Sequence, residues 1–205
     1  RHRGRRGGDL AALAYINPIT ALAMVRFLAP NPGDCIGITA GASAIGRMLG
    51  RMLAAKGVQP ISIVRSQAAL EALASEPVDV VLAGERLPLL DAALDAVGGP
   101  ISEQVAAALR PNGLLLHYGL LSGQPLRWTG KAKLRLFRLR DWVHSVPRGE
   151  MQTAMEEAFA EIRSGAATTV VAAHYPLEAF RDALAHQASS GRKGKILFNS
   201  VSYTH

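Results

Sequence analysis

The regular alternation of short β-branched runs with apolar-striped helical stretches constrains the fold of this chain more than any other feature of its sequence. Helical patterns join most of the strand patterns, which is typical of a parallel sheet with helices on both faces. We therefore predict an α/β, doubly wound, mainly parallel six-stranded sheet. The expected strands are CIGITA (35–40), PISIVR (60–65), VDVVLAG (78–84), AALDAVG (92–98), LLLHYG (114–119) and KLRLFRL (133–139).

The helices expected between these strands cover residues 43–57, 66–76 and 100–113, the last segment including the signal that stops its helix. Before the first strand, helical periodicity is interrupted at Asn17-Pro18, where Asn17 is expected to cap a second helix and Pro18 to lie in its first turn. The connection between the third and fourth strands, 84–91, is too short for a full crossover helix.

Composition narrows the class of protein. A chain of 205 residues with 49% hydrophobic content can bury a substantial core. Its one cysteine, Cys35, provides neither a disulfide framework nor a cysteine zinc site, which favours a reducing compartment. No apolar stretch reaches the roughly 18 residues of a membrane span, and the first residues lack the apolar core of a signal peptide. We expect a cytoplasmic protein without a membrane partner.

The net charge of +7 is unevenly distributed, because four of the 23 basic residues lie in the first six positions. We interpret residues 1–8 as a disordered basic tail. We interpret a second basic segment, 130–140, as a strand whose leucines alternate with solvated basic residues. No aromatic-stacking module accompanies either segment, so nucleic acid is not the expected partner.

The segment AGASAIG (40–46) follows the first strand and opens a helix. At such a turn, backbone amides and the helix dipole face an anionic ligand. Gly41 is expected to relax the turn, Ser43 to cap the helix, and Gly46 to let helix and strand approach. A tight turn without a ligand is the alternative, but the six-strand context favours a dinucleotide pyrophosphate, with serine in the middle small position of the fingerprint.

The end of the second strand indicates which dinucleotide binds. Arg65 and Ser66 stand where an acidic residue usually meets the adenosine ribose. An arginine there can donate to a 2′-phosphate, so we predict NADP(H) rather than NAD. The alternative is an ordinary solvated arginine at a strand end.

Several separated motifs occur in the order known from one superfamily: INPITA (16–21), AGASAIG (40–46), LDAVGGP (94–100), LRPNGLLLHYG (109–119), KLRLFRLRDW (133–142) and GRKGKILFN (191–199). The chain resembles the medium-chain dehydrogenase/reductase superfamily, in its zinc-independent quinone oxidoreductase and 2-enoyl thioester reductase branch. The resemblance implies a Rossmann-type cofactor domain followed by a C-terminal remnant of the catalytic domain.

The resemblance also implies roles for particular positions. Thr20 would lie beside the nicotinamide, Arg65 would bind the 2′-phosphate, and Gly98 and Gly99 would leave room for ribose or nicotinamide. Lys195 would approach the cofactor or brace the last strand. The full set of expected cofactor-binding residues is Thr20, Gly41, Ala42, Ser43, Ala44, Ile45, Gly46, Arg65, Ser66, Gly98, Gly99, Tyr118, Gly119, Phe137, Leu139 and Lys195.

Alternatives to these roles stay open at this point. Helix capping competes for Thr20, and packing competes for Tyr118 and Phe137. No metal is expected, because the position where zinc-dependent relatives place a ligand is Ile16 and the six histidines are scattered. No catalytic residue is identified. Tyr15 and His117 are candidate proton donors, although a lone tyrosine or histidine beside an apolar run is usually structural.

In the family that the chain resembles, a β-rich catalytic portion precedes INPITA, whereas here only the Arg/Gly tail does. We therefore expect a truncated member. Its segments 168–180 and 194–200, which would ordinarily pair with that portion, would be left with exposed strand edges unless they find new pairing partners, dimerise or are covered. The predicted organisation is a tail (1–8), lead-in helices (9–30), a dinucleotide-binding domain (31–145) and a C-terminal part (146–205).

The function that the resemblance implies is NADPH-dependent reduction of a small-molecule electrophile, namely a quinone, an enone or an enoyl thioester, by hydride transfer to a conjugated C=C bond or a quinone. The alternative is a catalytically idle module that binds NADP(H) or dimerises. A homodimer through the sixth strand, 133–139, is expected in either case.

Overall fold

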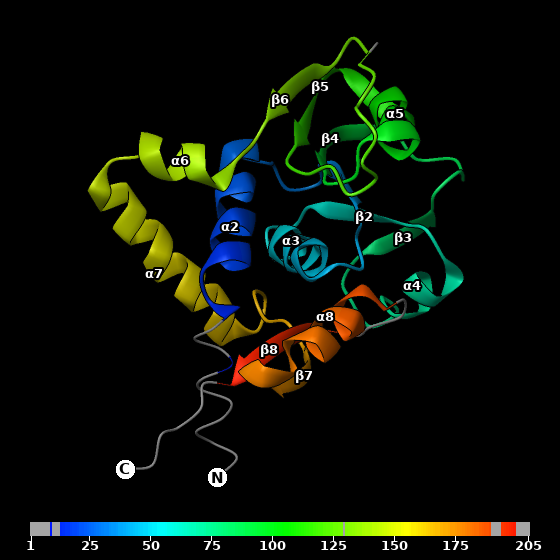
Figure 1. Cartoon of the computed structure of the whole chain (residues 1–205). Coiled ribbons are helices and arrows are strands. Elements are labelled where there is room, and N and C mark those ends of the chain that lie inside the picture. Colours follow the sequence, from blue (N-terminus) through cyan, green and yellow to red (C-terminus); the bar gives the residue numbers. More distant parts are fainter. Residues whose placement is uncertain (1–8, 10–12, 129, 190–193, 200–205) are drawn as a thin grey trace.

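The computed structural model describes residues 9, 13–128, 130–189 and 194–199, so the predicted tail lies outside the described residues. Six strands form the central sheet in the order β3-β2-β1-β4-β5-β6, and all neighbouring pairs are parallel (Figure 1). This confirms the predicted doubly wound sheet, whose strand order reverses between β1 and β4. The strands are β1 (Cys35–Thr39), β2 (Gln59–Val64), β3 (Asp79–Leu82), β4 (Leu90–Asp95), β5 (Leu109–His117) and β6 (Lys133–Leu136).

Helices cover both faces of this sheet because its central strands are apolar on both sides. Leu94 and Leu116 pack toward α2 (Ile16–Leu28) and α3 (Ala44–Ala54). Their neighbours Ala93 and Leu115 point the opposite way, toward α5 (Gly99–Ala108). A short helix, α4 (Gln67–Glu71), follows β2.

Three further α-helices, a 3₁₀ turn and a small second sheet follow β6 in the described part of the chain. The short helix α6 (Leu139–Ser145) is followed along the chain by α7 (Arg148–Ser164). Ala154 and Ala158 of α7 pack against Ile19 and Leu22 of α2. Strands β7 (Val171–Pro176) and β8 (Lys195–Asn199) pair in parallel. Between them lie a 3₁₀ turn, η1 (Leu177–Ala179), and helix α8 (Phe180–Ala188) (Figure 1). The two C-terminal strand segments therefore pair with each other.

Several predicted boundaries differ from the observed ones. Within the expected segment 100–113, which included its stop, helix α5 ends at Ala108, because Pro111 disfavours a helical Arg110, and β5 already begins at Leu109. Helix α4 ends at Glu71 rather than at residue 76, because Leu73 is the only buried residue of the stretch 66–76, which therefore lacks a buried helical face. Asn17 lies inside α2, and Tyr15 takes the cap position.

The sixth strand is also shorter than predicted. It ends at Leu136, because Phe137 turns into the core on the α2 side and α6 begins two residues later. As expected, residues 83–89 connect β3 to β4 without a helix. No helix in the described part of the chain is long and apolar enough to span a bilayer.

Candidate functional site

A cleft of about 400 Å³ opens at the carboxyl edge of the sheet, beside the point where the strand order reverses. It brings together the turn after β1, the end of β2, the turn after β4 and the loop after β5. Ligands of open α/β sheets bind in this position. The lining residues are Ala40, Ala42, Ser43, Ile63, Val64, Arg65, Ser66, Ala69, Val97, Ile101, Leu121 and Ser122.

The fingerprint turn supplies one wall of the cleft. Ser43 caps α3, its Oγ accepting the Gly46 amide at 3.1 Å. The other amides of the first helical turn have no partner within the helix and face outward at its positive end. A Cβ on Gly46 would come within 2.6 Å of the carbonyl oxygens of Ala40 and Gly41, so only glycine lets this helix approach the strand.

The predicted role of Gly41 is wrong in one respect. The left-handed residue of the turn is Ala40, with φ 51°, not Gly41. Gly41 is needed instead because a Cβ there would come within 2.5 Å of the Ser62 side chain on β2. An alanine in this conformation stores backbone strain directly at the cleft.

Arg65 and Ser66 stand at the opposite wall, immediately after β2. Arg65 is exposed, and it is the only charged residue among those that line the cleft. The Ser66 Oγ accepts the Ala69 amide at 3.3 Å and caps α4. This wall therefore offers a cation to an anionic group without a competing carboxylate.

A buried polar network lies below the turn after β4. The Asp95 side chain is fully buried, and it accepts hydrogen bonds from the hydroxyls of Thr39 at 2.7 Å and Ser102 at 2.6 Å. Its Oδ2 also lies 2.6 Å from His117 Nδ1, while the Val97 amide donates to Oδ1 at 3.1 Å. One carboxyl group thereby connects the ends of β1, β4 and β5 to the start of α5.

The loop after β5 packs over this network. Leu121 donates its amide to the Ala96 carbonyl at 3.0 Å, and the Ser122 hydroxyl donates to the Val97 carbonyl at 2.7 Å. A Cβ on Gly98 would meet the Gln124 carbonyl oxygen at 2.5 Å and the Leu120 side chain at 2.7 Å. Residues 120–124 therefore occupy the space over the double glycine.

Gly98 and Gly99, which were expected to leave room for ribose or nicotinamide, lie under the loop 120–124 in this structure. Both have positive φ, 75° and 60°, and both accommodate the chain's own loop. Gly119 is equally close-packed, since a Cβ there would lie 2.9 Å from the Ala96 carbonyl oxygen. Their contacts with a cofactor remain predictions.

The remaining predicted positions do not line the cleft. Thr20 is buried in α2, where its hydroxyl donates to the Ile16 carbonyl one turn earlier rather than capping the helix. Phe137 is buried in the core, and Leu139 begins α6 beside it. Lys195 starts β8, where its amide donates to the Val170 carbonyl at 2.8 Å.

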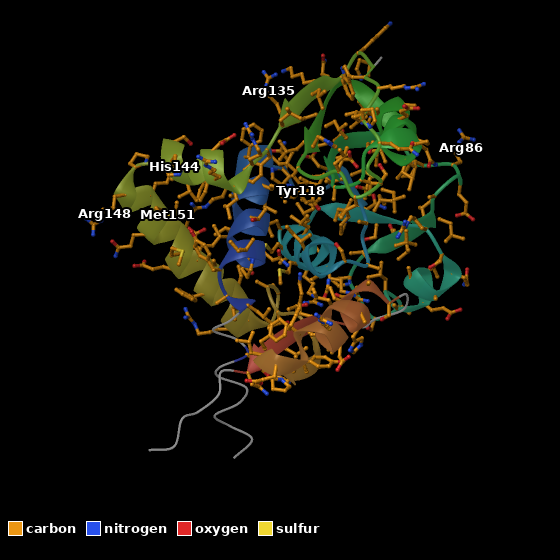
Figure 2. All side chains as sticks on the ribbon, viewed as in Figure 1. Arg86, Tyr118, Arg135, His144, Arg148 and Met151 are labelled. Atoms are coloured by element: carbon orange, nitrogen blue, oxygen red, sulfur yellow. The ribbon has the colours of Figure 1, made fainter. Side chains whose placement is uncertain are left out.

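Tyr118 lies in the interior beside α2 (Figure 2). Its hydroxyl is buried without a hydrogen-bond partner in the described part of the chain. Burial raises the pKa of this phenol well above its usual value, and the nearby charge of Asp95 adds to the effect. The side chain therefore stays neutral and is a hydrogen-bond donor rather than a base.

Within the described ranges, no group of three or more His, Cys, Asp or Glu side chains is placed to hold a metal ion. Ile16, at the position where zinc-dependent relatives were expected to place a ligand, is 58% exposed and offers no ligand atom.

Comparison with known proteins identifies the family. Residues 67–197 match the family model described as zinc-binding dehydrogenase, which covers more than half of the chain. The chain belongs to this family. The resemblance to the medium-chain dehydrogenase/reductase superfamily is thereby confirmed.

The curated relatives include the mitochondrial enoyl-[acyl-carrier-protein] reductase of Mus musculus, 28% identical over 197 residues, which cover 85% of this chain and 53% of that protein. An NADPH quinone oxidoreductase of Kluyveromyces marxianus is 29% identical over 147 residues, 58% of this chain and 39% of that protein. The chain thus spans about half the length of the first of these relatives.

Solved structures agree on the fold. A crystal structure from Bacillus thuringiensis, provisionally assigned as an NADPH:quinone reductase, has a TM-score of 0.85 at 27% identity, covering 94% of this chain and 64% of that one. A mycobacterial protein complexed with NADPH has a TM-score of 0.77 at 25% identity, covering 93% and 64%.

Sequence reasoning missed the Asp95 network and the covering loop. An available signal was the acidic residue inside an otherwise buried strand, since a buried carboxyl group needs several partners. Nothing local in LLSGQ (120–124) indicates that this loop lies over Gly98.

Proposed function

We propose that this chain is the NADP(H)-binding part of a zinc-independent reductase that transfers hydride to a quinone or to the conjugated C=C bond of an enone or enoyl thioester. The observation that carries the proposal is the cleft, which has a helix N-terminus on one wall and Arg65 as its only charged lining residue on the other. The named relatives and the NADPH complex of a structural neighbour support the same cofactor.

The residues present fit this cofactor. The N-terminus of α3, with Ser43 and the small residues Ala42 and Ala40, would hold the pyrophosphate close to backbone amides. Arg65 and Ser66 would bind the 2′-phosphate. When bound, NADPH supplies the hydride.

What the chain itself contributes is orientation and exclusion of water. Val97, Ile101 and Leu121 give the cleft an apolar side, which lowers the local dielectric constant around the bound cofactor. The Asp95 network fixes the Val97 amide and, through the loop after β5, the position of Leu121 and Ser122. No described residue is assigned to protonate the product.

Three finer predictions belong to the same proposal. The chain contributes the cofactor half of the enzyme, with 31–145 as its dinucleotide-binding domain. It works in the cytoplasm. It pairs with a second copy through β6, whose outer edge has no partner strand within the described sheet. A catalytically idle NADP(H)-binding module remains the second candidate function, because the described residues include no assigned proton donor.

Turnover separates the two functions. The purified chain is incubated with NADPH deuterated at the transferable position and a 2-enoyl thioester, and the product is analysed by mass spectrometry. In a second assay with a benzoquinone, whose reduced oxygens exchange deuterium with water, hydroquinone formation and NADPH oxidation are followed instead. Carbon-bound deuterium in the saturated thioester, or hydroquinone formed in step with NADPH oxidation, with an increased KM for NADPH in Arg65→Ala, supports the reductase. Saturable NADPH binding without either product supports the idle module, and absence of binding contradicts both.

A further inference from the structure

The turn between β1 and α3 presents backbone amides that the protein itself leaves unpaired. Within the described part of the chain, the amides of Ala42, Ala44 and Ile45 donate to no protein acceptor. The Ser43 amide, in contrast, donates to the Ala40 carbonyl at 2.9 Å and closes the turn. Ala42 and Ser43 both line the cleft, so the unpaired amides lie at its wall, where an anion could accept from them.

Arg47 holds this turn from outside the cleft. Its Nε donates to the Ala42 carbonyl at 3.2 Å, and Arg47 is not among the residues that line the cleft. The Ala42 carbonyl belongs to the same peptide group as the Ser43 amide, whose hydrogen already binds the Ala40 carbonyl. Because both polar atoms of this peptide group are held, it cannot rotate freely, and the directions of the neighbouring Ala42 and Ala44 amides are restricted with it.

Glu76 fixes the guanidinium that makes this contact. Arg47 Nη1 lies 3.1 Å from Glu76 Oε1, and the Glu76 side chain is only 10% exposed. The segment that carries Glu76 packs closely on α3, since a Cβ on Gly50 would lie 2.5 Å from the Val78 side chain. The Arg47 side chain therefore extends between a nearly buried carboxylate and the turn, and the carboxylate limits its choice of rotamers.

Attachment of α3 to the segment before β3 does not by itself require Arg47. Arg51, one turn farther along α3, donates to both oxygens of the Glu76 carboxylate at 2.7 Å. Arg51 Nη1 also donates to the carbonyls of Gly165 and Thr168, each at 3.2 Å. The two arginines thus share one carboxylate but have different second contacts: Arg51 reaches the C-terminal part, and Arg47 reaches the turn.

We propose that Arg47, anchored by Glu76, is a positioning residue that fixes the turn 40–43 for the pyrophosphate of a dinucleotide. This inference rests on the proposed NADP(H) site and deepens it. Amides that are already aligned lose less conformational entropy when they bind an anion, so affinity rises without a direct contact from Arg47. NADPH and NADH share the pyrophosphate, so Arg47 affects both dinucleotides, whereas Arg65 would meet only the 2′-phosphate.

Titration of the whole chain with three probes tests this role: NADPH, NADH and adenosine 2′-monophosphate, which carries the 2′-phosphate but no pyrophosphate. We expect Arg47→Met, which keeps the apolar stem, to weaken both dinucleotides by roughly five-fold or more and to leave adenosine 2′-monophosphate within about two-fold. Arg65→Ala should instead weaken NADPH and adenosine 2′-monophosphate and spare NADH.

Arg51→Met is the matched control, because it removes the other arginine of the same carboxylate. Its urea midpoint should fall at least as far as that of Arg47→Met, while its dinucleotide affinity stays within about two-fold of wild type. A loss of affinity that merely followed the loss of stability would therefore be equal in the two variants, and would overturn the inference.

Arg47→Lys separates positioning from charge and is the variant to use if circular dichroism shows Arg47→Met unfolded. Lysine keeps the positive charge but lacks the planar fork that reaches a carbonyl and a carboxylate together, so both dinucleotides should still weaken roughly three-fold or more. Full affinity in Arg47→Lys, or binding of Arg47→Met within two-fold of wild type, would overturn the inference and leave the cofactor site intact. A wild type that binds neither dinucleotide would instead contradict the proposed function, and this inference with it.

Discussion

The loops that follow β1 and β2 leave a cleft at the carboxyl edge of the sheet, whereas the loops that follow β4 and β5 pack against each other on the neighbouring part of that edge. In the first region small residues keep side chains away from helix amides, and one arginine supplies charge. In the second, Asp95 and the loop 120–124 satisfy the polar groups internally. The first, open region is where we propose that the cofactor binds, whereas the second, closed region supplies rigidity through its internal hydrogen bonds.

The largest expected effect comes from removing the centre of the closed region. Asp95→Ala leaves Thr39, Ser102 and His117 buried or half-buried without their partner, so the free energy of unfolding should fall by about 3–5 kcal/mol. Urea denaturation measures it. The control is Asp141→Asn at an exposed pair, expected within about 0.5 kcal/mol of wild type. Equal effects of the two variants would show that the network is not structural.

The open region should respond to an added methyl group. In Gly46→Ala, the new Cβ meets two carbonyl oxygens at 2.6 Å, so α3 must shift away from β1, at a cost of about 2–3 kcal/mol, and NADPH binding should weaken. Thermal unfolding and NADPH titration report the two effects. Gly149→Ala in α7 meets nothing within 4 Å, and its stability should stay equal or rise slightly. A tolerated Gly46→Ala would refute the close-approach argument.

Outside both regions, Arg51 of α3 joins the carboxylate of Glu76 to the C-terminal part of the chain. This carboxylate accepts from Arg51 Nε and Nη2, each at 2.7 Å, while Arg51 Nη1 donates to the Gly165 and Thr168 carbonyls at 3.2 Å. These hydrogen bonds from Arg51, and then those from Arg47, hold the pKa of Glu76 below its ordinary value of 4.5. A depressed folded-state pKa stabilises the fold above the unfolded-state pKa, and the stabilisation is lost as pH falls through the folded-state value.

Glu76→Gln should therefore be about 1–2 kcal/mol less stable than wild type at neutral pH, and the gap should close under acidic conditions. Urea midpoints measured across the acidic range test this. Glu71→Gln, at an exposed position without an ion pair in the described part of the chain, should show neither effect. A gap that widens on acidification would contradict the sign.

A smaller effect is expected where the covering loop is held. Ser122→Ala removes the 2.7 Å hydrogen bond to the Val97 carbonyl and the 3.1 Å bond from the Gln124 amide. The loss should be about 1 kcal/mol, with faster hydrogen exchange in 120–124. Ser75→Ala, exposed and without a side-chain hydrogen bond among the described residues, is the control. Unchanged exchange would mean that Leu121 and backbone bonds alone hold the loop.

The same contrast separates what the sequence could predict from what it could not. The sheet and the open region follow from local patterns: period-two and helical spacing gives the strands and helices, and AGASAIG directly follows a strand. The closed region depends on contacts between distant residues, such as Asp95 with His117, which no local pattern encodes. For this reason the glycines at 98 and 99 were expected to face a ligand rather than the loop at 120–124.

The ends of helices were predicted wrongly for a related reason. Residues 66–76 have helical composition, but the whole stretch would stay helical only with a buried face, and Leu73 is its only buried residue. Thr20, Tyr118, Phe137, Leu139 and Lys195 came from the family resemblance alone, and the structure places them in the core or in the second sheet rather than on the cleft wall. Their contacts with a cofactor remain predictions.

Isothermal titration of the chain with NADPH and with NADH, comparing wild type with Arg65→Ala, tests the central claim most directly. We expect wild type to bind NADPH more tightly than NADH, and Arg65→Ala to lose roughly ten-fold or more in NADPH affinity while its NADH affinity is unchanged, because only NADPH carries the 2′-phosphate. Equal weakening of both dinucleotides, or no binding of either by wild type, would contradict the assignment of the cleft.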